Sequence, residues 1–532
     1  MKAYRLVQYL VAGTLVLAAV LGGTALAQSV PERTLVVALS GEIPTLDPDF
    51  SRYPLSNLVL LNVYEQWFQY GEMEVEGEPY TRSDISQIKG AAIESWEVSE
   101  DRMSVLLNVR QGVKFPMSGN EVTADDFLYW LDKGPETASG ILWNLDTASI
   151  DSWEKTGEYQ FRLGFMTPVQ PMFWMLARDQ AWGVVDSQTA MEHATEEDPW
   201  GSRWLARNYA GSGEYYIERW DPGNEMVLRA HTEGYWREPP YFDTIVLRVI
   251  TSAATRALLL QRGEVDIALD LSQEELESLR GADGVRVLDV PSRSRNLVFL
   301  NTSIKPFDDV LVRQAVSHLV PYDQIVDEFY RGRALRMYGP LTQLDDGYDG
   351  SAWEYEYDVD RAKELLAEAG YDDGLTFTIN VMTGHTTARR LAILLQEAAR
   401  PAGVTIDVRQ VTPAVLAEEE ATGTAQATLR TDFLNYVDDA YYAMRGYLSH
   451  SATNRSHYAN ERIDEIYEEL RVEFDPAIRQ ELATEYQAIL TEDAPQLWLA
   501  STPLTYALRA DILGFKVLED SLIWFYPLYR AE

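Results

Sequence analysis

The chain has 532 residues, of which 83 are acidic and 45 are basic, and its net charge is −38. A field of this sign repels nucleic acid and anionic lipid head groups, so the composition excludes both as partners and favours a soluble monomer. A single hydrophobic core stops growing near about 250–300 residues, so this length predicts two or three lobes. The absence of cysteine excludes disulfide bonds.

The first residues have the pattern of a secretory signal peptide. Lys2 and Arg5 precede an apolar run over residues 10–21, and Ala25-Leu26-Ala27 supplies the small residues of a cleavage site. The apolar run is shorter than the roughly 20 residues that a membrane-spanning helix needs. We therefore expect residues 1–27 to be removed. Because there is no cysteine to carry a lipid, the protein is expected in the periplasm without a lipid anchor.

The first half of the remaining chain is predicted to be rich in strands and loops. Residues 33–39 are a short apolar and β-branched run typical of a buried strand, and the glycine and prolines of 40–48 indicate a loop. Two extended runs are expected within 92–115. Thr123 is suited to cap a helix that starts at the next residue. Residues 135–240, rich in Trp, Tyr, Gly and Pro, predict a loop-heavy region.

The second half alternates helical and extended patterns. The clearest helix covers 358–370, where Asp358 can cap the start and Gly370 suits the left-handed exit. The other expected elements are helices at 254–262, 309–331, 387–400 and a pair within 460–490, strands at 375–381 and 404–411, and short strands from 496 onward. This alternation predicts an α/β fold with a partly parallel sheet.

The sequence offers no motif for catalysis, a metal or a cofactor. Its six histidines include no pair at i,i+3 or i,i+4, and without cysteine a structural zinc site is disfavoured. There is no G-x-S-x-G elbow, no Walker loop and no dinucleotide fingerprint. Adjacent acids such as Asp438-Asp439 carry little information among 83 carboxylates. We therefore predict no enzyme activity, no metal and no cofactor.

Six passages together resemble the family 5 extracellular solute-binding proteins of ABC importers, which include oligopeptide, dipeptide and nickel receptors. The first is LVVALSGEIPTLDP, and all six occur in the order of the family at 35–48, 94–115 with 123–127, 211–236, 258–268, 296–320 and 358–374. Each passage also has a packing role of its own, such as a helix start or a helix-to-strand exit. They therefore identify a scaffold and not a ligand site.

The resemblance implies a two-lobed periplasmic-binding-protein clamp of the α/β class, type II-like, with mixed sheets flanked by helices. Lobe I would comprise residues 33–290 and 504–532, with an insertion subdomain at about 75–205. Lobe II would comprise 291–503. The hinge crossings would lie near 291–296 and 498–503, where a few residues absorb the change in dihedral angles as the lobes close. The partners implied are a small-molecule ligand and the membrane permease subunits with their ATPase.

In peptide-binding relatives, the loop after the first strand and a segment of the other lobe line the cleft. By this resemblance, the ligand-binding residues here are Glu42, Ile43, Pro44, Arg430, Asp432, Phe433, Asn435 and Tyr436. The relatives carry an aspartate for the peptide ammonium where this chain has Asn435. Asparagine accepts a hydrogen bond but cannot neutralise a desolvated charge. Asp432 or Glu42 is the alternative partner for such an ammonium.

The predicted function is a periplasmic receptor that delivers a peptide or peptide-like solute to an ABC importer. An oligosaccharide receptor of the same fold is the alternative, because Asn435 and aromatic residues such as Trp143, Trp174, Trp182 and Trp204 suit a sugar. A secreted glycoside hydrolase is a further alternative, which would need two acids about 5–10 Å apart across a groove.

Overall fold

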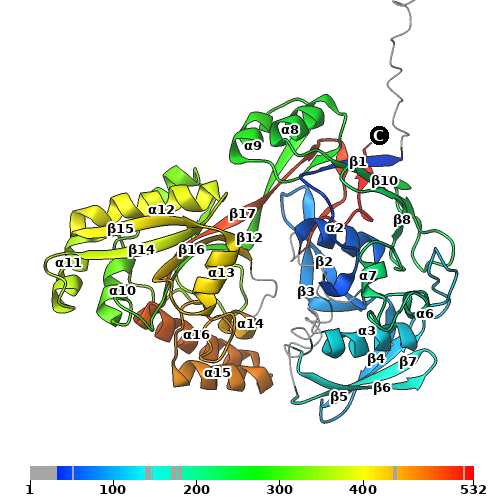
Figure 1. Cartoon of the computed structure of the whole chain (residues 1–532), viewed down its shortest axis with the longest axis horizontal. Coiled ribbons are helices and arrows are strands. Elements are labelled where there is room, and N and C mark those ends of the chain that lie inside the picture. Colours follow the sequence, from blue (N-terminus) through cyan, green and yellow to red (C-terminus); the bar gives the residue numbers. More distant parts are fainter. Residues whose placement is uncertain are drawn as a thin grey trace, which may run out of the picture. The chain divides into compact units, whose positions relative to one another are not determined.

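The strand expected near the start of the chain is β1, Thr34–Leu39, and all six of its residues are buried. In the computed structural model of the protein (Figure 1), β1 belongs to an 11-stranded mixed sheet with the order β15-β14-β16-β12-β17-β11-β1-β10-β9-β8, to which β13 is added beside β17. A strand covered on both faces needs no polar alternation, which explains the continuous apolar run of β1.

The structure describes residues 33–50, 53–137, 145, 148–168, 177, 183–434, 440–518 and 522–531, with the backbone alone at 85–86 and 432–434. The predicted signal peptide lies outside this range. Within it, no helix is both long enough and apolar enough to cross a membrane.

The first half of the chain builds strands of the large sheet, the smaller sheet β4-β5-β7-β6, and the strands β2 and β3 of another small sheet, to which β19 from the C-terminal part of the chain is added in the order β19-β3-β2. Its strands after β1 are β2 (Phe68–Glu74), β3 (Tyr80–Gly90), β4 (Ile93–Val98), β5 (Ser104–Val109), β6 (Ile150–Gly157), β7 (Gln160–Phe165), β8 (Tyr215–Asp221), β9 (Glu225–Ala230), β10 (Thr244–Val249) and β11 (Ile267–Ala268). Its helices are η1 (Pro48–Phe50), α2 (Pro54–Val63), α3 (Ala124–Thr137), α6 (Ser187–Glu192), α7 (Ser202–Leu205), α8 (Ala253–Arg262) and α9 (Gln273–Leu279).

Helix α3 begins directly after Thr123, as expected, and Asp126 accepts a hydrogen bond from the Thr123 N–H at 2.8 Å. Its inner face packs on the core through aromatic rings. The ring of Trp67 lies 5.0 Å from that of Phe127 and 5.9 Å from that of Trp130, both in edge-to-face geometry. This packing fixes α3 rigidly beside the segment that follows β1.

The second half builds a partly parallel sheet, as expected from its β-α-β pattern. Strands β14 (Leu375–Met382) and β15 (Val404–Val411) pair in parallel along their whole lengths, and α12 (Thr386–Ala399) connects them and packs on both. The remaining strands are β12 (Val285–Leu300), β13 (Leu335–Arg336), β16 (Ala427–Leu434), β17 (Gln496–Arg509), β18 (Ile512–Leu513), β19 (Phe515–Val517) and β20 (Tyr529–Arg530). The helices are α10 (Val310–Ser317), η2 (Gln324–Phe329), α11 (Val359–Glu368), η3 (Arg400–Ala402), α13 (Pro413–Ala421), α14 (Ala440–Met444), α15 (Glu461–Val472) and α16 (Pro476–Asp493).

The described core divides into separate apolar clusters along the two halves of the chain. Two clusters draw their buried residues from Leu35 to Val290 and from Tyr506 to Leu528. Two others draw theirs only from Leu297 to Ala500. The long strands β12 and β17 contribute residues to both groups of clusters and pair antiparallel (Figure 1). The register of this pairing shifts between Val290 and Ser294 and between Asn296 and Leu297.

Two expectations about single elements are wrong. The helix expected over 309–331 is α10 followed by the separate π-helical turn η2, because Val320-Pro321 interrupts the helical hydrogen bonding. The tail expected to hold only short strands begins with β17, which has 14 residues. Its pairing partner β12 is distant in sequence, so a local pattern could not reveal its length.

Candidate functional site

The loop after β1 presents two of the predicted ligand-binding residues to solvent. The side chains of Glu42 and Pro44 are exposed, whereas Ile43 is only 2% exposed and packs in the core. Ile43 as a whole is therefore part of the core, and Glu42 and Pro44 are the residues of this loop that solvent reaches. The exposed carboxylate of Glu42, next to the buried Ile43, can accept hydrogen bonds from an ammonium or amide group.

The same loop is anchored at its far end by hydrogen bonds to helix α2 and to the residues that cap the C-terminal ends of α2 and α7. The Leu46 N–H donates to the carbonyl of Ala206 at 3.1 Å, and the Tyr64 hydroxyl donates to the carbonyl of Leu46 at 3.2 Å. The Thr45 N–H donates to the hydroxyl of Ser56 at 3.2 Å. Backbone groups at the end of the loop are thus hydrogen-bonded to residues of α2 and to the C-cap residues of α2 and α7.

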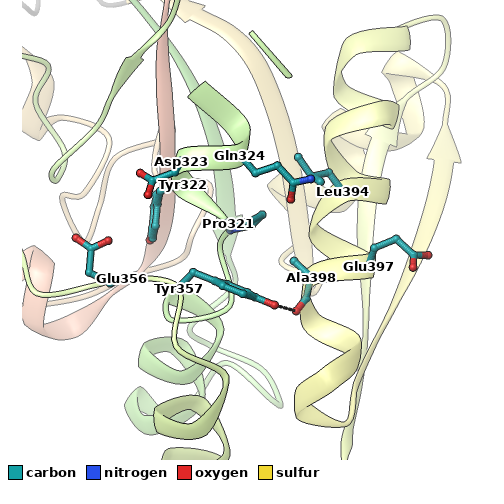
Figure 2. A pocket seen from close by; sticks show the side chains of 9 residues that line it. All are labelled: Pro321, Tyr322, Asp323, Gln324, Glu356, Tyr357, Leu394, Glu397 and Ala398. Carbon is teal, nitrogen blue, oxygen red and sulfur yellow. Dashed lines mark hydrogen bonds between the residues drawn. The ribbon is translucent and has the colours of Figure 1, made fainter. Parts of the chain in front are cut away.

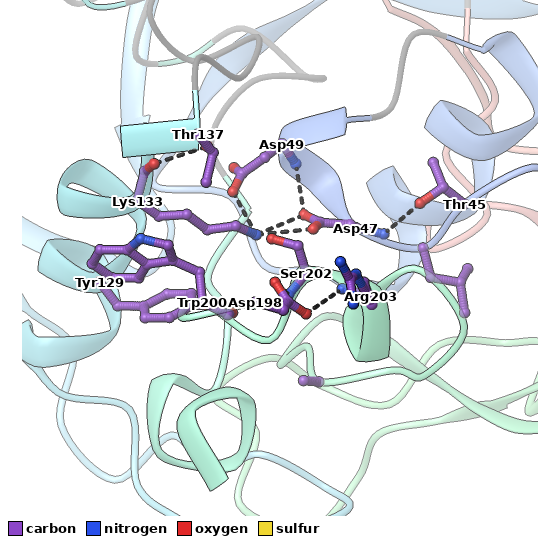
Figure 3. A network of polar contacts seen from close by, with 12 residues as sticks. Thr45, Asp47, Asp49, Tyr129, Lys133, Thr137, Asp198, Trp200, Ser202 and Arg203 are labelled. Carbon is purple, nitrogen blue, oxygen red and sulfur yellow. Dashed lines mark hydrogen bonds and ion pairs between the residues drawn. The ribbon is translucent and has the colours of Figure 1, made fainter. Parts of the chain in front are cut away.

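A buried ion cluster completes this anchorage, and we call Lys133, Asp47 and Asp49 the lysine triad (Figure 3). The Lys133 Nζ lies 3.0 and 2.9 Å from the two carboxylate oxygens of Asp47 and 2.7 Å from Oδ2 of Asp49. Each of these three side chains is at most 1% exposed. The triad therefore links α3 to the end of the loop through side chains that are fully buried.

Burial and charge act against each other within the lysine triad. The net pKa of Asp49 is raised to about 6. Burial is the main cause, the Lys133 ammonium opposes it, and the neighbouring Asp47 carboxylate adds to it. Burial alone would lower the pKa of Lys133, but the two carboxylates outweigh that effect and raise it above its ordinary value. Asp49 is thus a carboxyl of the triad whose pKa is raised by burial in spite of the nearby ammonium.

The second predicted segment, β16, brings Arg430 into a half-buried ion pair. Its Nε and Nη2 donate to the two carboxylate oxygens of Glu420 at 3.1 and 2.6 Å, which is the bidentate geometry of a strong pair. Arg455 Nε also lies 3.4 Å from Glu420, and His457 Nε2 lies 2.8 Å from its carbonyl oxygen. Burial lowers the pKa of Arg455, and the Glu420 carboxylate opposes this. The Arg430 side chain keeps 23% exposure, so this oriented guanidinium can meet an anionic group.

The other predicted residues of this segment are only partly described. Asp432 and Phe433 belong to β16, where Phe433 pairs with Arg295 of β12, but their side chains lie outside the described structure. Asn435 and Tyr436 lie outside the described residues. The same is true of Trp143, Trp174 and Trp182, whereas Trp204 lies on α7 and stacks on His193 with ring centroids 4.1 Å apart.

A second buried ion cluster was not foreseen from the sequence, and we call Arg237, Glu65 and Glu214 the arginine cluster. Arg237 lies 3.9 Å from Glu65 and 3.6 Å from Glu214, and its guanidinium stacks 4.3 Å from the ring of Trp236. Trp236 also donates its indole N–H to Glu65 at 2.8 Å. The net pKa of Glu214 is raised to about 7. Burial is the main cause, Arg237 opposes it, and Glu65 adds to it. Only the three-dimensional contact of distant segments could identify this group.

Two cavities lie apart from the predicted ligand-binding residues. One of about 520 Å³ lies between the η2 region and the end of α12, where the Tyr357 hydroxyl donates to the carbonyl of Ala398 at 3.0 Å (Figure 2). Its carboxylates are already paired, Asp323 and Glu356 with Arg336 and Glu397 with Arg400. The other, beside Glu65 and Glu214, has about 10 Å³, which is the size of one water molecule. Neither has the groups of a peptide site.

No group of three or more His, Cys, Asp or Glu residues within the described part of the chain is arranged to hold a metal ion. The acids of the two buried clusters are each engaged by a cation of the chain itself. Of the predicted ligand-binding residues, the structure thus describes an exposed carboxylate, Glu42, on the loop after β1 and a half-buried guanidinium, Arg430, on β16.

The described fold thus combines one large mixed sheet and smaller sheets with flanking helices, and the long strands β12 and β17 pair antiparallel within the large sheet. The profile of the family described as "Bacterial extracellular solute-binding proteins, family 5 Middle" matches residues 87–454. This is more than half of the chain, and the protein belongs to this family.

Similar proteins agree with this assignment. The chain is 24% identical over 499 residues to the "Probable D,D-dipeptide-binding periplasmic protein DdpA" of Escherichia coli (strain K12), covering 92% of each chain. It is 26% identical over 501 residues to the glutathione-binding protein GsiB of Pectobacterium atrosepticum, covering 92% of this chain and 93% of that protein. The fold matches the periplasmic binding protein DppA of Helicobacter pylori in complex with the peptide STSA, with a TM-score of 0.78, 22% identity, and coverage of 94% and 98%.

Proposed function

We propose that this protein is the periplasmic receptor of an ABC importer, which captures a peptide or peptide-like solute and delivers it unaltered to the membrane permease. The single observation that carries this proposal is the family match over residues 87–454, supported by relatives named for binding a D,D-dipeptide and glutathione. The protein acts as a monomer with a small-molecule ligand, after removal of residues 1–27, and its partners are the permease subunits and their ATPase.

The proposal includes two lobes that close on the ligand. Lobe I comprises 33–290 and 504–532, with the insertion at about 75–205, and lobe II comprises 291–503. The separate apolar clusters of the two halves support this division. The hinge lies where β12 and β17 cross, near 291–296 and 498–503, and the register shift next to Val290 supports this place because it interrupts the pairing of the strands.

The ligand is bound by groups of opposite charge from the two lobes. Glu42 accepts hydrogen bonds from the ammonium end of a peptide, and the exposed edge of Arg430 pairs with its carboxylate end. Asp432, Phe433, Asn435 and Tyr436 complete the lobe II side. The bidentate contact with Glu420 supports the role of Arg430, because a guanidinium that is already oriented loses little entropy on binding.

The test is a binding assay with purified mature protein and three probes: the dipeptide Met-Leu, glutathione and a β-linked oligosaccharide. We expect a peptide probe to stabilise the protein by RT ln(1 + [L]/Kd), which is about 2.7 kcal/mol at 100 times Kd. The probe should be recovered intact, and solution scattering should give a smaller particle with ligand than without it. A shift with the oligosaccharide alone would replace the ligand class, and cleavage of a probe would overturn the receptor function.

A matched pair of variants tests the role of Arg430. Helix α13 carries two neighbouring carboxylates, Glu420 and Glu419, and each is paired with an arginine of a strand. Arg430→Met should weaken peptide binding at least tenfold. Arg409→Met removes the exposed partner of Glu419, which lies 2.8 Å away, and should leave binding unchanged. Equal affinities for both variants would exclude Arg430 from the site.

A further inference from the structure

We propose that the lysine triad holds the loop that carries Glu42 and Pro44 in its binding conformation, so that Lys133 is a positioning residue for ligand binding. The ligand part of this inference rests on the proposed function. The positioning part concerns the free protein and stands on the contacts of the loop itself.

The first argument is the connectivity of the triad. Lys133 belongs to α3, which is fixed in the core by the rings of Phe127 and Trp130 against Trp67. Its ammonium group reaches two carboxylates, of Asp47 and Asp49, at the end of the loop (Figure 3). A rigid helix of the predicted insertion subdomain therefore determines where the loop ends.

The second argument is the hydrogen bonding that depends on Asp47. Its Oδ1 accepts from the Asp49 N–H at 3.1 Å, and its own N–H donates to the Thr45 hydroxyl at 3.1 Å. The carbonyl of Asp47 accepts from the Phe50 N–H at 3.3 Å. The side chain that pairs with Lys133 thus also shapes the backbone that leads back to Pro44.

The third argument is energetic. A buried ion pair is seldom more stable than apolar residues of the same volume, because desolvation of the charges offsets their attraction. Two carboxylates on one ammonium are less favourable still, since one negative charge has no cation of its own within the triad. Stability alone does not account for this arrangement, whereas fixing a loop in one position does.

The test compares three proteins by hydrogen exchange without ligand: the native protein, Lys133→Met, and the uncharged variant Lys133→Met/Asp47→Asn/Asp49→Asn. The single substitution leaves two carboxylates buried without a cation, so it should lower the melting temperature. The uncharged variant should recover most of that loss. In both, the amides of Leu46, Asp49 and Phe50 should exchange at least tenfold faster, whereas those of β1 and β14 should not change.

The matched control is Lys155→Met. Lys155 forms another lysine–aspartate pair at α3, with Asp125 at 2.7 Å, but both side chains of this pair are exposed. This variant should keep the exchange of the loop at the native rate. If Lys133→Met fails to fold, Asp49→Asn keeps the Lys133–Asp47 pair and should accelerate the exchange of residues 45–50 to a smaller extent, with the rest of the protein unchanged.

Ligand affinity is the measurement that would not change if the triad had a purely structural role. In the uncharged variant, the affinity for Met-Leu or glutathione, whichever binds the native protein, should fall at least tenfold although stability is recovered. Native loop exchange, or exchange that increases evenly through the whole region, would overturn the inference, and so would native affinity in that variant. Accelerated loop exchange without binding of either probe to the native protein would retain the positioning role and overturn the proposed ligand class.

Discussion

The lysine triad and the arginine cluster have the same composition, one cation and two buried carboxylates, but different geometry. In the triad, the ammonium lies within 3.0 Å of both acids. In the arginine cluster, the separations are 3.6 and 3.9 Å, and aromatic rings instead of carboxylates cover the guanidinium. The compact ammonium is a point charge that draws its partners in, whereas the planar guanidinium divides its contacts between charge and ring faces.

In both clusters, burial is the main cause that raises the pKa of one acid, and the cation opposes it. The close ammonium opposes the effect of burial on Asp49, whose pKa reaches about 6. Arg237 is farther from Glu214, whose pKa rises to about 7. In each cluster, the acid with the raised pKa can relieve the surplus negative charge by taking up a proton, and Glu214 does so closer to neutral pH than Asp49. Four variants would break or sharpen this contrast.

The largest effect is expected for Lys133→Met. Removing the cation leaves two carboxylates fully buried, and breaking such a pair costs about 3–5 kcal/mol. Urea unfolding at pH 7.5 should therefore show a midpoint far below that of the native protein. A loss of less than about 1 kcal/mol would mean that water reaches the triad and that its burial is not maintained in solution.

A smaller effect is expected for Arg237→Met. An unsatisfied buried group costs about 1–3 kcal/mol, and here Glu214 can accept a proton in place of the lost cation. The loss should be greater at pH 8 than at pH 6, as measured by unfolding at the two values. If the loss were the same at both, Glu214 would not be the group that compensates.

Glu214→Gln should change how the stability depends on pH more than it changes the stability at any one pH. A carboxyl whose pKa is raised in the folded state contributes stability that is full below about pH 4.5 and is lost as the pH rises through about 7. The variant should therefore lose less stability than the native protein between pH 5 and 8, by about 1.4 kcal/mol for each pKa unit. Melting temperatures across this range, with Glu97→Gln as an exposed control, would measure the difference. Parallel profiles would contradict it.

The smallest effect is expected for Lys155→Met. Its ion pair with Asp125 is exposed on α3, and pairs of this kind contribute about 0–1 kcal/mol. Added salt should reduce even this contribution in the native protein. A loss as large as that of Lys133→Met would show that charge on α3, and not burial, governs the stability of this region.

The sequence determined those features that depend on local chemistry. Helix α11 begins after Asp358, whose side chain accepts from two backbone N–H groups, and Gly370 adopts the left-handed conformation just past the end of the helix. Both follow from the capping preferences of neighbouring residues. The family itself was also predictable, because its passages are scaffold segments whose patterns survive in a single sequence.

Only the tertiary structure decided which distant groups meet. Asp47 and Lys133 are 86 residues apart, and Glu65 and Arg237 are more than 170 apart, so no spacing in the sequence joins them. The burial of Ile43 between exposed Glu42 and Pro44 has the same origin, because the loop is bent by its anchors and follows no strand or helix period. Local patterns report the free energy of neighbouring residues, whereas long-range contacts depend on how the whole chain packs.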